Sequence, residues 1–187
     1  MRVIAGRARG TRLAAPRGMM TRPTADRVRE ALFSIIQSRF GLEDVRVLDI
    51  CSGTGSLGIE ALSRGGATCT FIECDKNAAA ALRQNLQATR VTEQSELLVL
   101  DAHKALQLLA SRRDHFDLVF FDPPYDSRLY ATVPEAVGDL GILAPNGLLV
   151  VECAARKPLP AILGRFRKHD SRTYGDTTLE FYILEGE

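Results

Sequence analysis

The sequence has few cysteines, and their spacing does not suit a metal site. Among its 187 residues there are four, Cys51, Cys69, Cys74 and Cys153, with no Cys-x-x-Cys pair and no histidine pair nearby. This spacing matches neither the usual zinc sites nor a disulfide framework. We therefore expect no bound metal, and cysteines that are reduced and mostly buried.

Long apolar segments are also missing. No run approaches the roughly 18 apolar residues that indicate a membrane-spanning helix, and the apolar run Val3-Ile4-Ala5 is too short for the core of a signal peptide. Low-complexity tracts and internal repeats are absent as well. A chain of 187 residues, 45% of them hydrophobic, can bury the core of one soluble domain, which we expect to be cytoplasmic.

Lysine is missing from residues 1–40, yet this stretch is strongly basic. It holds nine arginines against only Asp26 and Glu30, a charge of about +7, whereas the whole chain carries +1. The remainder is therefore acidic. A basic arm on an acidic body suggests a polyanionic partner, because arginine pairs with phosphate oxygens and releases counterions.

Residues 1–23 alternate weakly and contain several glycines, which favours a β-ribbon or an extended arm. The candidate phosphate-binding residues of this arm are Arg7, Arg9, Arg12, Arg17 and Arg22. From Thr24, a plausible N-cap, an amphipathic helix with Val28, Leu32 and Ile36 on one face continues until Gly41. This helix should be the first element of the body (residues 24–187) and dock on the rest of it, so that it holds the arm in place. The alternative is that the arm is a solvated tail.

A strand at residues 45–50, a glycine-rich loop and a helix follow, as in nucleotide-binding βα units. The loop residues expected to contact a cofactor are Ser52, Gly53, Thr54 and Gly55. Glycines let the backbone turn and approach a ligand, and the following helix offers free N–H groups. The spacing Gly53-x-Gly55-x-x-Gly58 also matches the NAD fingerprint, so the loop alone does not identify the cofactor.

Acidic residues at three strand ends favour S-adenosylmethionine. Asp49 would repel a pyrophosphate but suits a cationic amino group, met directly or through water. Glu73 lies about 20 residues beyond the first glycine, where an acid binds ribose hydroxyls, and Asp75 either shares that role or caps the next helix. Asp101, with Ala102, follows the third strand and could accept a hydrogen bond from an adenine amino group.

A strongly apolar segment, residues 116–121, runs into Asp122-Pro123-Pro124-Tyr125. A strand this apolar belongs in the middle of a covered parallel sheet, and the prolines must end it because they lack the N–H that a ladder needs. Asp122 and Tyr125 should therefore lie at the carboxyl edge of the sheet, where α/β proteins bind ligands.

The tetrapeptide resembles the (Asp/Asn)-Pro-Pro-(Tyr/Phe) motif of methyltransferases that use S-adenosylmethionine to modify exocyclic or amide nitrogens. Together with Arg22-Pro23-Thr24, Arg29 to Phe33 and Asp49 to Gly58, it resembles the RsmD family of bacterial 16S rRNA guanine-N2 methyltransferases. Cys51 departs from this pattern, since an aromatic residue is expected there, and the change bears on packing against the cofactor.

The resemblance implies methyl transfer to guanine N2 in 16S rRNA, either free or within an assembling 30S particle. The Asp122 carboxylate and the Pro123 carbonyl could accept the hydrogens of the amine and orient its lone pair. Pro123 and Pro124 would fix the direction of that carbonyl. Tyr125 could stack on a base swung out of the RNA.

The expected fold is a single Rossmann-like α/β domain with a seven-stranded sheet, parallel except for one strand of a C-terminal hairpin. That hairpin should pair residues 165–173 with 177–184, after a short helix at 158–163. Three alternative functions remain: methylation of adenine N6 or of a protein glutamine, NAD-dependent oxidoreduction, and RNA binding without catalysis.

Overall fold

The computed structural model describes residues 1–15, 23–124 and 128–186. Its α-helices are α1 (Pro23–Arg39), α2 (Ser56–Ser63), α3 (Lys76–Ala88), α4 (Ala102–Ser111) and α5 (Leu129–Asp139), with a 3₁₀ helix at Thr92–Gln94. Its strands are β1 (Arg46–Ile50), β2 (Thr68–Ile72), β3 (Ser95–Leu98), β4 (Phe116–Phe121), β5 (Leu143–Ala154), β6 (Ile162–Leu163), β7 (Phe166–Tyr174) and β8 (Thr177–Leu184).

These strands form one sheet in the order β3-β2-β1-β4-β5-β8-β7-β6. Strands β1 to β5 pair in parallel, and β8 is antiparallel to both β5 and β7. The predicted α/β class, with a mostly parallel sheet and a C-terminal hairpin, is confirmed. The chain reverses its winding between β1 and β4, which is where doubly wound sheets bind ligands.

The helix predicted at residues 158–163 is wrong. A short strand forms at its end, so the sheet has eight strands and not the predicted seven. Ile162 and Leu163 instead form β6, which pairs with Arg167 and Phe166 of β7. Gly164, with a positive φ of 60°, makes the tight turn between them. This turn lays Leu163 onto the sheet, where it is buried.

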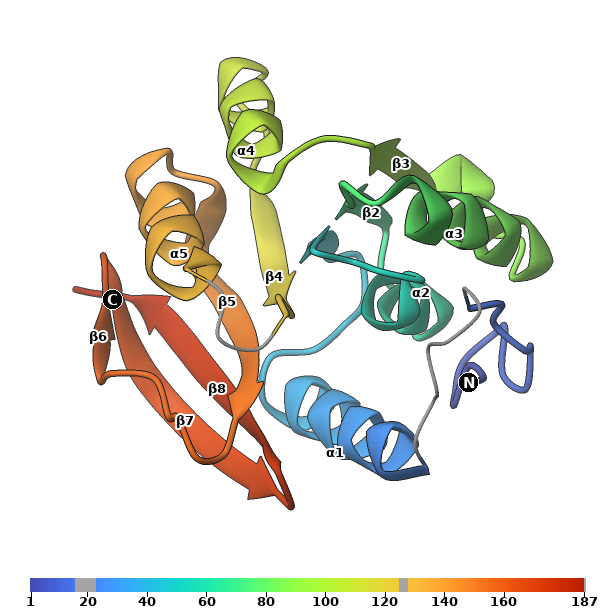
Figure 1. Cartoon of the computed structure of the whole chain (residues 1–187), viewed down its shortest axis with the longest axis horizontal. Coiled ribbons are helices and arrows are strands. Elements are labelled where there is room, and N and C mark those ends of the chain that lie inside the picture. Colours follow the sequence, from blue (N-terminus) through green and yellow to red (C-terminus); the bar gives the residue numbers. More distant parts are fainter. Residues whose placement is uncertain (16–22, 125–127, 187) are drawn as a thin grey trace.

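Helices cover both faces of the sheet (Figure 1). Helices α1, α2 and α3 pack on one face, and α4 and α5 pack on the other. Strand β4 lies between these layers, with Phe120 against Phe33 of α1 and Phe121 against Tyr130 of α5, at ring-centroid distances of 5.6 and 6.0 Å. The predicted central, doubly covered strand is confirmed.

Helix α1 begins at Pro23, one residue before the predicted cap, because proline is favoured in the first helical turn. Its predicted apolar residues Val28, Leu32 and Ile36 are buried. The helix ends at Arg39, and Gly41, with φ of 79°, donates its N–H to the Ile36 carbonyl at 3.1 Å. Such a left-handed glycine is a common helix terminator.

Residues 1–15 fold back on themselves beside α2 and α3 (Figure 1). Arg2 and Arg12 form an antiparallel bridge, and the Val3 N–H donates to the Thr11 carbonyl at 3.0 Å. Val3 and Leu13 are buried against the domain. In the described part, the segment is therefore a short docked ribbon.

Candidate active site

The glycine loop connects β1 to α2, and its two glycines serve different purposes. Gly55 has φ of 79°, and a Cβ there would lie 2.2 Å from Leu82 Cδ1 of α3. Gly53 also has a positive φ, of 55°, but no atom lies within 4 Å of the place a Cβ would take. Gly55 thus lets the loop approach Leu82 of α3 closely, whereas Gly53 faces open space that a ligand can enter.

Asp49 is buried in β1 directly below the loop, with 1% of its surface exposed. Its Oδ2 accepts the Gly58 N–H at 2.9 Å, which ties the strand to the start of α2. Desolvation, with a smaller contribution from Glu73, raises the pKa of Asp49 to about 7, although the Gly58 N–H opposes the shift. Positive charge on a ligand in the loop would therefore stabilise the ionised carboxylate.

Glu73 holds the loop from the end of β2. Its Oε2 accepts the Gly53 N–H at 2.8 Å and its Oε1 accepts the Asp75 N–H at 2.7 Å. A carboxylate has about four acceptor positions, so lone pairs remain for ribose hydroxyls. Glu73 thus fits its predicted cofactor role and also fixes Gly53, which sequence analysis did not anticipate.

Asp75 and Asp101 are both helix caps. Asp75 Oδ1 accepts the N–H groups of Asn77 and Ala78 at 2.9 and 2.7 Å, and Asp101 Oδ1 accepts the His103 N–H at 3.0 Å. The alternative that Asp75 caps α3 is therefore confirmed. Asp101 remains exposed at the end of β3, and the predicted cofactor contacts of these two acids stay predictions.

The other predicted loop residues line the same edge. Ser52 donates its N–H to the Ile72 carbonyl at 3.0 Å and accepts the Gly55 N–H at 2.7 Å, so the loop is fastened to β2. Thr54 is buried, as is Ala102 at the start of α4. Cys51 has φ of 61° where the chain leaves β1, and desolvation, with nearby acids, raises the pKa of its thiol to about 12, so the thiol stays protonated.

The Asp122-Pro123-Pro124 segment leaves β4 beside this loop. The Asp122 N–H points to the Ile50 carbonyl of β1 at 3.4 Å, which places the motif next to the start of the glycine loop. Pro123 is buried and Pro124 is exposed, while Tyr125 lies outside the described residues. The Asp122 side chain reaches solvent, but the surrounding protein and then the Glu152 and Asp49 carboxylates raise its pKa well above the usual range.

Sequence analysis missed two residues next to this motif. The Tyr130 hydroxyl of α5 donates to the Glu152 carbonyl of β5 at 2.9 Å and lies 3.4 Å from the Pro123 carbonyl. It thereby joins the ends of β4 and β5. Glu152 is half-buried, and desolvation raises the pKa of its carboxyl. The available signal was an acid near the end of the apolar strand that follows β4.

The structure describes three of the five arm arginines that were predicted to bind phosphate. Arg7, Arg9 and Arg12 are exposed, and so is Arg2, which sequence analysis did not select. Arg7 Nη2 donates to Gln94 Oε1, so this side chain is already engaged within the protein. Arg17 and Arg22 lie outside the described residues.

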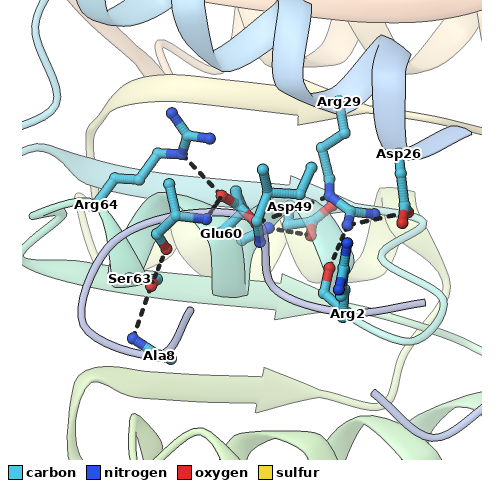
Figure 2. Close-up of polar contacts among 11 residues, drawn as sticks. Arg2, Ala8, Asp26, Arg29, Asp49, Glu60, Ser63 and Arg64 are labelled. Carbon is cyan, nitrogen blue, oxygen red and sulfur yellow. Dashed lines mark hydrogen bonds and ion pairs between the residues drawn. The ribbon is translucent and has the colours of Figure 1, made fainter. Parts of the chain in front are cut away.

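A buried glutamate of α2 anchors the arm, as Figure 2 shows. Glu60 accepts the N–H groups of Ile4 and Ala5 at 2.8 and 2.9 Å, and it pairs with Arg64 at 2.8 Å and, more distantly, with Arg29 at 3.8 Å. Arg29 Nη2 also donates to the Arg2 carbonyl, which connects α1 to the same segment. The arm is therefore held by buried polar contacts as well as by apolar packing.

Asn85 of α3 connects the arm to the glycine loop. It is 1% exposed, its Nδ2 donates to the carbonyls of Ala14 and Thr54 at 3.0 and 2.9 Å, and its Oδ1 accepts the Ala14 N–H at 2.6 Å. One side chain thus fixes the end of the described arm against the loop expected to hold the cofactor. An asparagine on an Ala-rich helix gave no sign of this role in the sequence.

Neither a metal site nor a membrane span is found in the described part of the chain. Residues 1–15, 23–124 and 128–186 contain no group of three or more His, Cys, Asp or Glu residues placed to hold a metal ion. None of the helices within these ranges is long and apolar enough to cross a membrane.

The chain matches a known protein family along nearly its whole length. A family model described as "Conserved hypothetical protein 95" matches residues 1–183. The chain belongs to this family. "Putative rRNA methyltransferase YlbH" of Bacillus subtilis is 35% identical to the chain over 186 residues, with 100% of each covered. "Ribosomal RNA small subunit methyltransferase D" of Escherichia coli is 32% identical, and the match covers 100% of this chain and 91% of that protein. The predicted resemblance to the RsmD family is thereby confirmed.

The fold of this chain also matches that of a solved structure. The structure described as "Putative methyltransferase yhhF from Escherichia coli" has a TM-score of 0.84 and 33% identity, and the match covers 100% of this chain and 99% of that one. The Rossmann-like methyltransferase fold predicted from the sequence is confirmed.

Proposed function

We propose that this chain transfers a methyl group from S-adenosylmethionine to the exocyclic N2 of a guanine in small-subunit rRNA. One observation carries the proposal. The Asp122-Pro123 pair lies at the carboxyl end of the central strand β4, with the Asp122 N–H directed at Ile50 of β1, just before the glycine loop. Acceptors for an amine thus stand beside a cofactor loop at the switch point of the sheet.

The residues around the loop fit S-adenosylmethionine. Open space at Gly53 admits the ligand, Glu73 retains lone pairs for ribose hydroxyls, and Asp49 balances positive charge. When bound, this cofactor supplies a methyl group whose bond to a positively charged sulfur breaks, the electron pair going to sulfur, as a nucleophile attacks. An NAD-dependent reaction is not retained, because the buried Asp49 carboxyl would oppose a pyrophosphate at this loop.

The Asp122 segment prepares the amine for attack. The lone pair of guanine N2 is delocalised into the ring, and acceptors that draw its two hydrogens help the nitrogen to pyramidalise and face the methyl group. The Asp122 carboxylate and the Pro123 carbonyl would supply these acceptors. After transfer the nitrogen carries an extra proton, and the raised pKa of Asp122 makes its carboxylate a suitable acceptor for it.

The docked arm would bring the RNA to this edge. Arg9 and Arg12 are exposed, and the arm is joined to the cofactor loop through Asn85. Phosphate contacts from these arginines would position the RNA without reading its bases, while Tyr125 would stack on the target base. The substrate would be 16S rRNA, free or in an assembling 30S particle, and the location cytoplasmic.

Assays with four substrates test the proposal. Purified protein and labelled S-adenosylmethionine are incubated with 16S rRNA, 30S particles, DNA or total protein from cells that lack the gene. We expect label as N2-methylguanosine in rRNA or in the particle, and much less with Asp122→Asn. Label in N6-methyladenine or in glutamine would instead support the related amino-methyltransferase reactions and contradict the guanine assignment.

A further inference from the structure

The ends of β4 and β5 bring two carboxylates together. The two strands are parallel with Phe121 opposite Val151, so the next residues, Asp122 and Glu152, are neighbours across the sheet. Glu152 pairs with Leu179 of β8, and Leu179 packs with the α1–α3 layer. By strand alternation, the Glu152 side chain therefore points toward the layer that contains the glycine loop and α2.

Both carboxylates lack a protein partner among the described residues. No hydrogen bond or ion pair within residues 1–15, 23–124 and 128–186 reaches either one. Their nearness is also reflected in the pKa of Asp122, which Glu152 raises after desolvation. Glu152 is half-buried and Asp122 reaches solvent. Two neighbouring carboxylates repel each other unless donors offset the repulsion, so their arrangement suits a ligand with adjacent N–H groups.

The end of β5 is fixed relative to the Asp122 motif. The Tyr130 hydroxyl donates to the Glu152 carbonyl at 2.9 Å and is 3.4 Å from the Pro123 carbonyl. Tyr130 also packs edge-on against Phe121, with the ring centroids 6.0 Å apart. Glu152 therefore has a defined place beside the acceptors that the proposed function assigns to the amine.

We propose that Glu152 accepts a hydrogen bond from guanine N1–H and so selects guanine as the target base. This inference rests on the proposed function and adds a specificity residue to it. Guanine presents N1–H and the 2-amino hydrogens side by side on one edge, which suits the neighbouring acceptors Glu152 and Asp122. Adenine presents a bare N1 lone pair next to its amino group, and the Glu152 carboxylate would repel that lone pair.

The test uses a substrate that separates N1–H from the reacting amine. Once the methylated guanine has been mapped, the same rRNA is prepared with 2-aminopurine at that position, which keeps the 2-amino group but has a bare N1 and lacks O6. A site that hydrogen-bonds a substrate N–H strongly rejects an analogue without it, and for half-buried Glu152 we expect kcat/KM to fall by about 10²-fold or more.

Two variants identify the residue responsible. The amide of Glu152→Gln can donate to a bare N1, so the preference for guanine over 2-aminopurine should fall by at least about tenfold, the equivalent of one hydrogen bond. Asp122→Asn should slow transfer to both bases and keep the preference. The loss of O6 affects all three enzymes alike, so it cancels when their preferences are compared. Calorimetry with S-adenosylhomocysteine checks that each variant is folded.

Two results would overturn the inference. One is equal turnover of guanine and 2-aminopurine by the unsubstituted chain, which needs no variant. The other is an unchanged preference in Glu152→Gln that still binds S-adenosylhomocysteine. Failure of the proposed function would look different, because the unsubstituted chain would then form no N2-methylguanosine in rRNA at all.

Discussion

At the scale of single residues, Asp122 is the group on which the proposed chemistry depends most. Its substitution by alanine removes one preorganised acceptor from the amine. Transfer should then slow by about 10²–10³-fold, the usual cost of losing one such electrostatic group. Single-turnover rates with saturating cofactor measure this effect, and calorimetry with S-adenosylhomocysteine shows whether the cofactor site is intact. Near-normal turnover with intact cofactor binding would remove Asp122 from the mechanism.

Asp49 predicts a pH dependence of cofactor binding. Its carboxyl has a pKa of about 7 in the free protein, so it is partly protonated at neutral pH. A cationic ligand favours the ionised form, and binding should therefore release protons and become tighter as the pH rises from about 6 to 8. Calorimetry of S-adenosylmethionine in buffers of different ionisation enthalpy measures the released protons. Asp49→Asn should lose this proton release. The ligand's own amino group also titrates, but it does so with both proteins, so the difference between them reports on Asp49.

Sequence analysis predicted that three candidate acids lie near strand ends, and the structure has them there, but some of their neighbours were missed. Asp49, Glu73 and Asp122 lie near strand ends, and such positions can be predicted because strand ends follow from apolar runs and prolines. Glu73 also holds Gly53, and Glu152 becomes the neighbour of Asp122. These relations depend on which strands are adjacent in the sheet, and that order cannot be read from local patterns.

At the scale of elements, substitutions in the glycine loop can separate its packing against α3 from its contact with a ligand. Alanine at either Gly53 or Gly55 would occupy a left-handed conformation, at a cost of about 1–2 kcal/mol. Gly55→Ala should lose more unfolding free energy because its Cβ meets Leu82 Cδ1. Gly53→Ala meets no protein atom, but it should weaken S-adenosylhomocysteine binding about tenfold or more, or about 1.4 kcal/mol.

Urea unfolding and calorimetry of this pair distinguish the two roles. Unchanged affinity in Gly53→Ala would mean that the ligand does not approach the loop at that glycine. Equal stability losses in both variants would mean that Leu82 moves aside at no cost.

Local patterns predicted most elements because helix and strand periods are clear in this chain. The end of α1 at Gly41 and the hairpin of β7 and β8 follow from residues close in sequence. The strand β6 was mistaken for a helix because a two-residue strand has no period of its own. Asn85 was missed because its partners, Ala14 and Thr54, lie 71 and 31 residues away in sequence.

At the scale of the whole molecule, residues 1–15 of the basic arm pack against the rest of the domain. Deletion of these residues would remove the buried Val3 and Leu13, so single charge substitutions are the better test of RNA binding. Arg9→Gln and Arg12→Gln should each lower the slope of log affinity against log salt by about 0.7–0.9 for each phosphate that the arginine no longer binds. Their stability should change by less than about 0.5 kcal/mol, because both side chains are exposed.

A matched control is available on the opposite side of the molecule. Arg167 is an exposed arginine of β7, which Figure 1 shows far from the N-terminal segment. Arg167→Gln removes the same charge and should leave the salt slope unchanged. If all three variants lowered the slope alike, the arm would contribute only net charge and not a defined RNA contact.

The central claim is methyl transfer to guanine N2 in small-subunit rRNA, and mapping of modified nucleotides tests it most directly. The 16S rRNA from cells with the gene, without it, and with only the Asp122→Asn form is digested and analysed for N2-methylguanosine. We predict one position that is methylated only when the unsubstituted chain is present. Identical N2-methylguanosine patterns in all three rRNAs would contradict the claim.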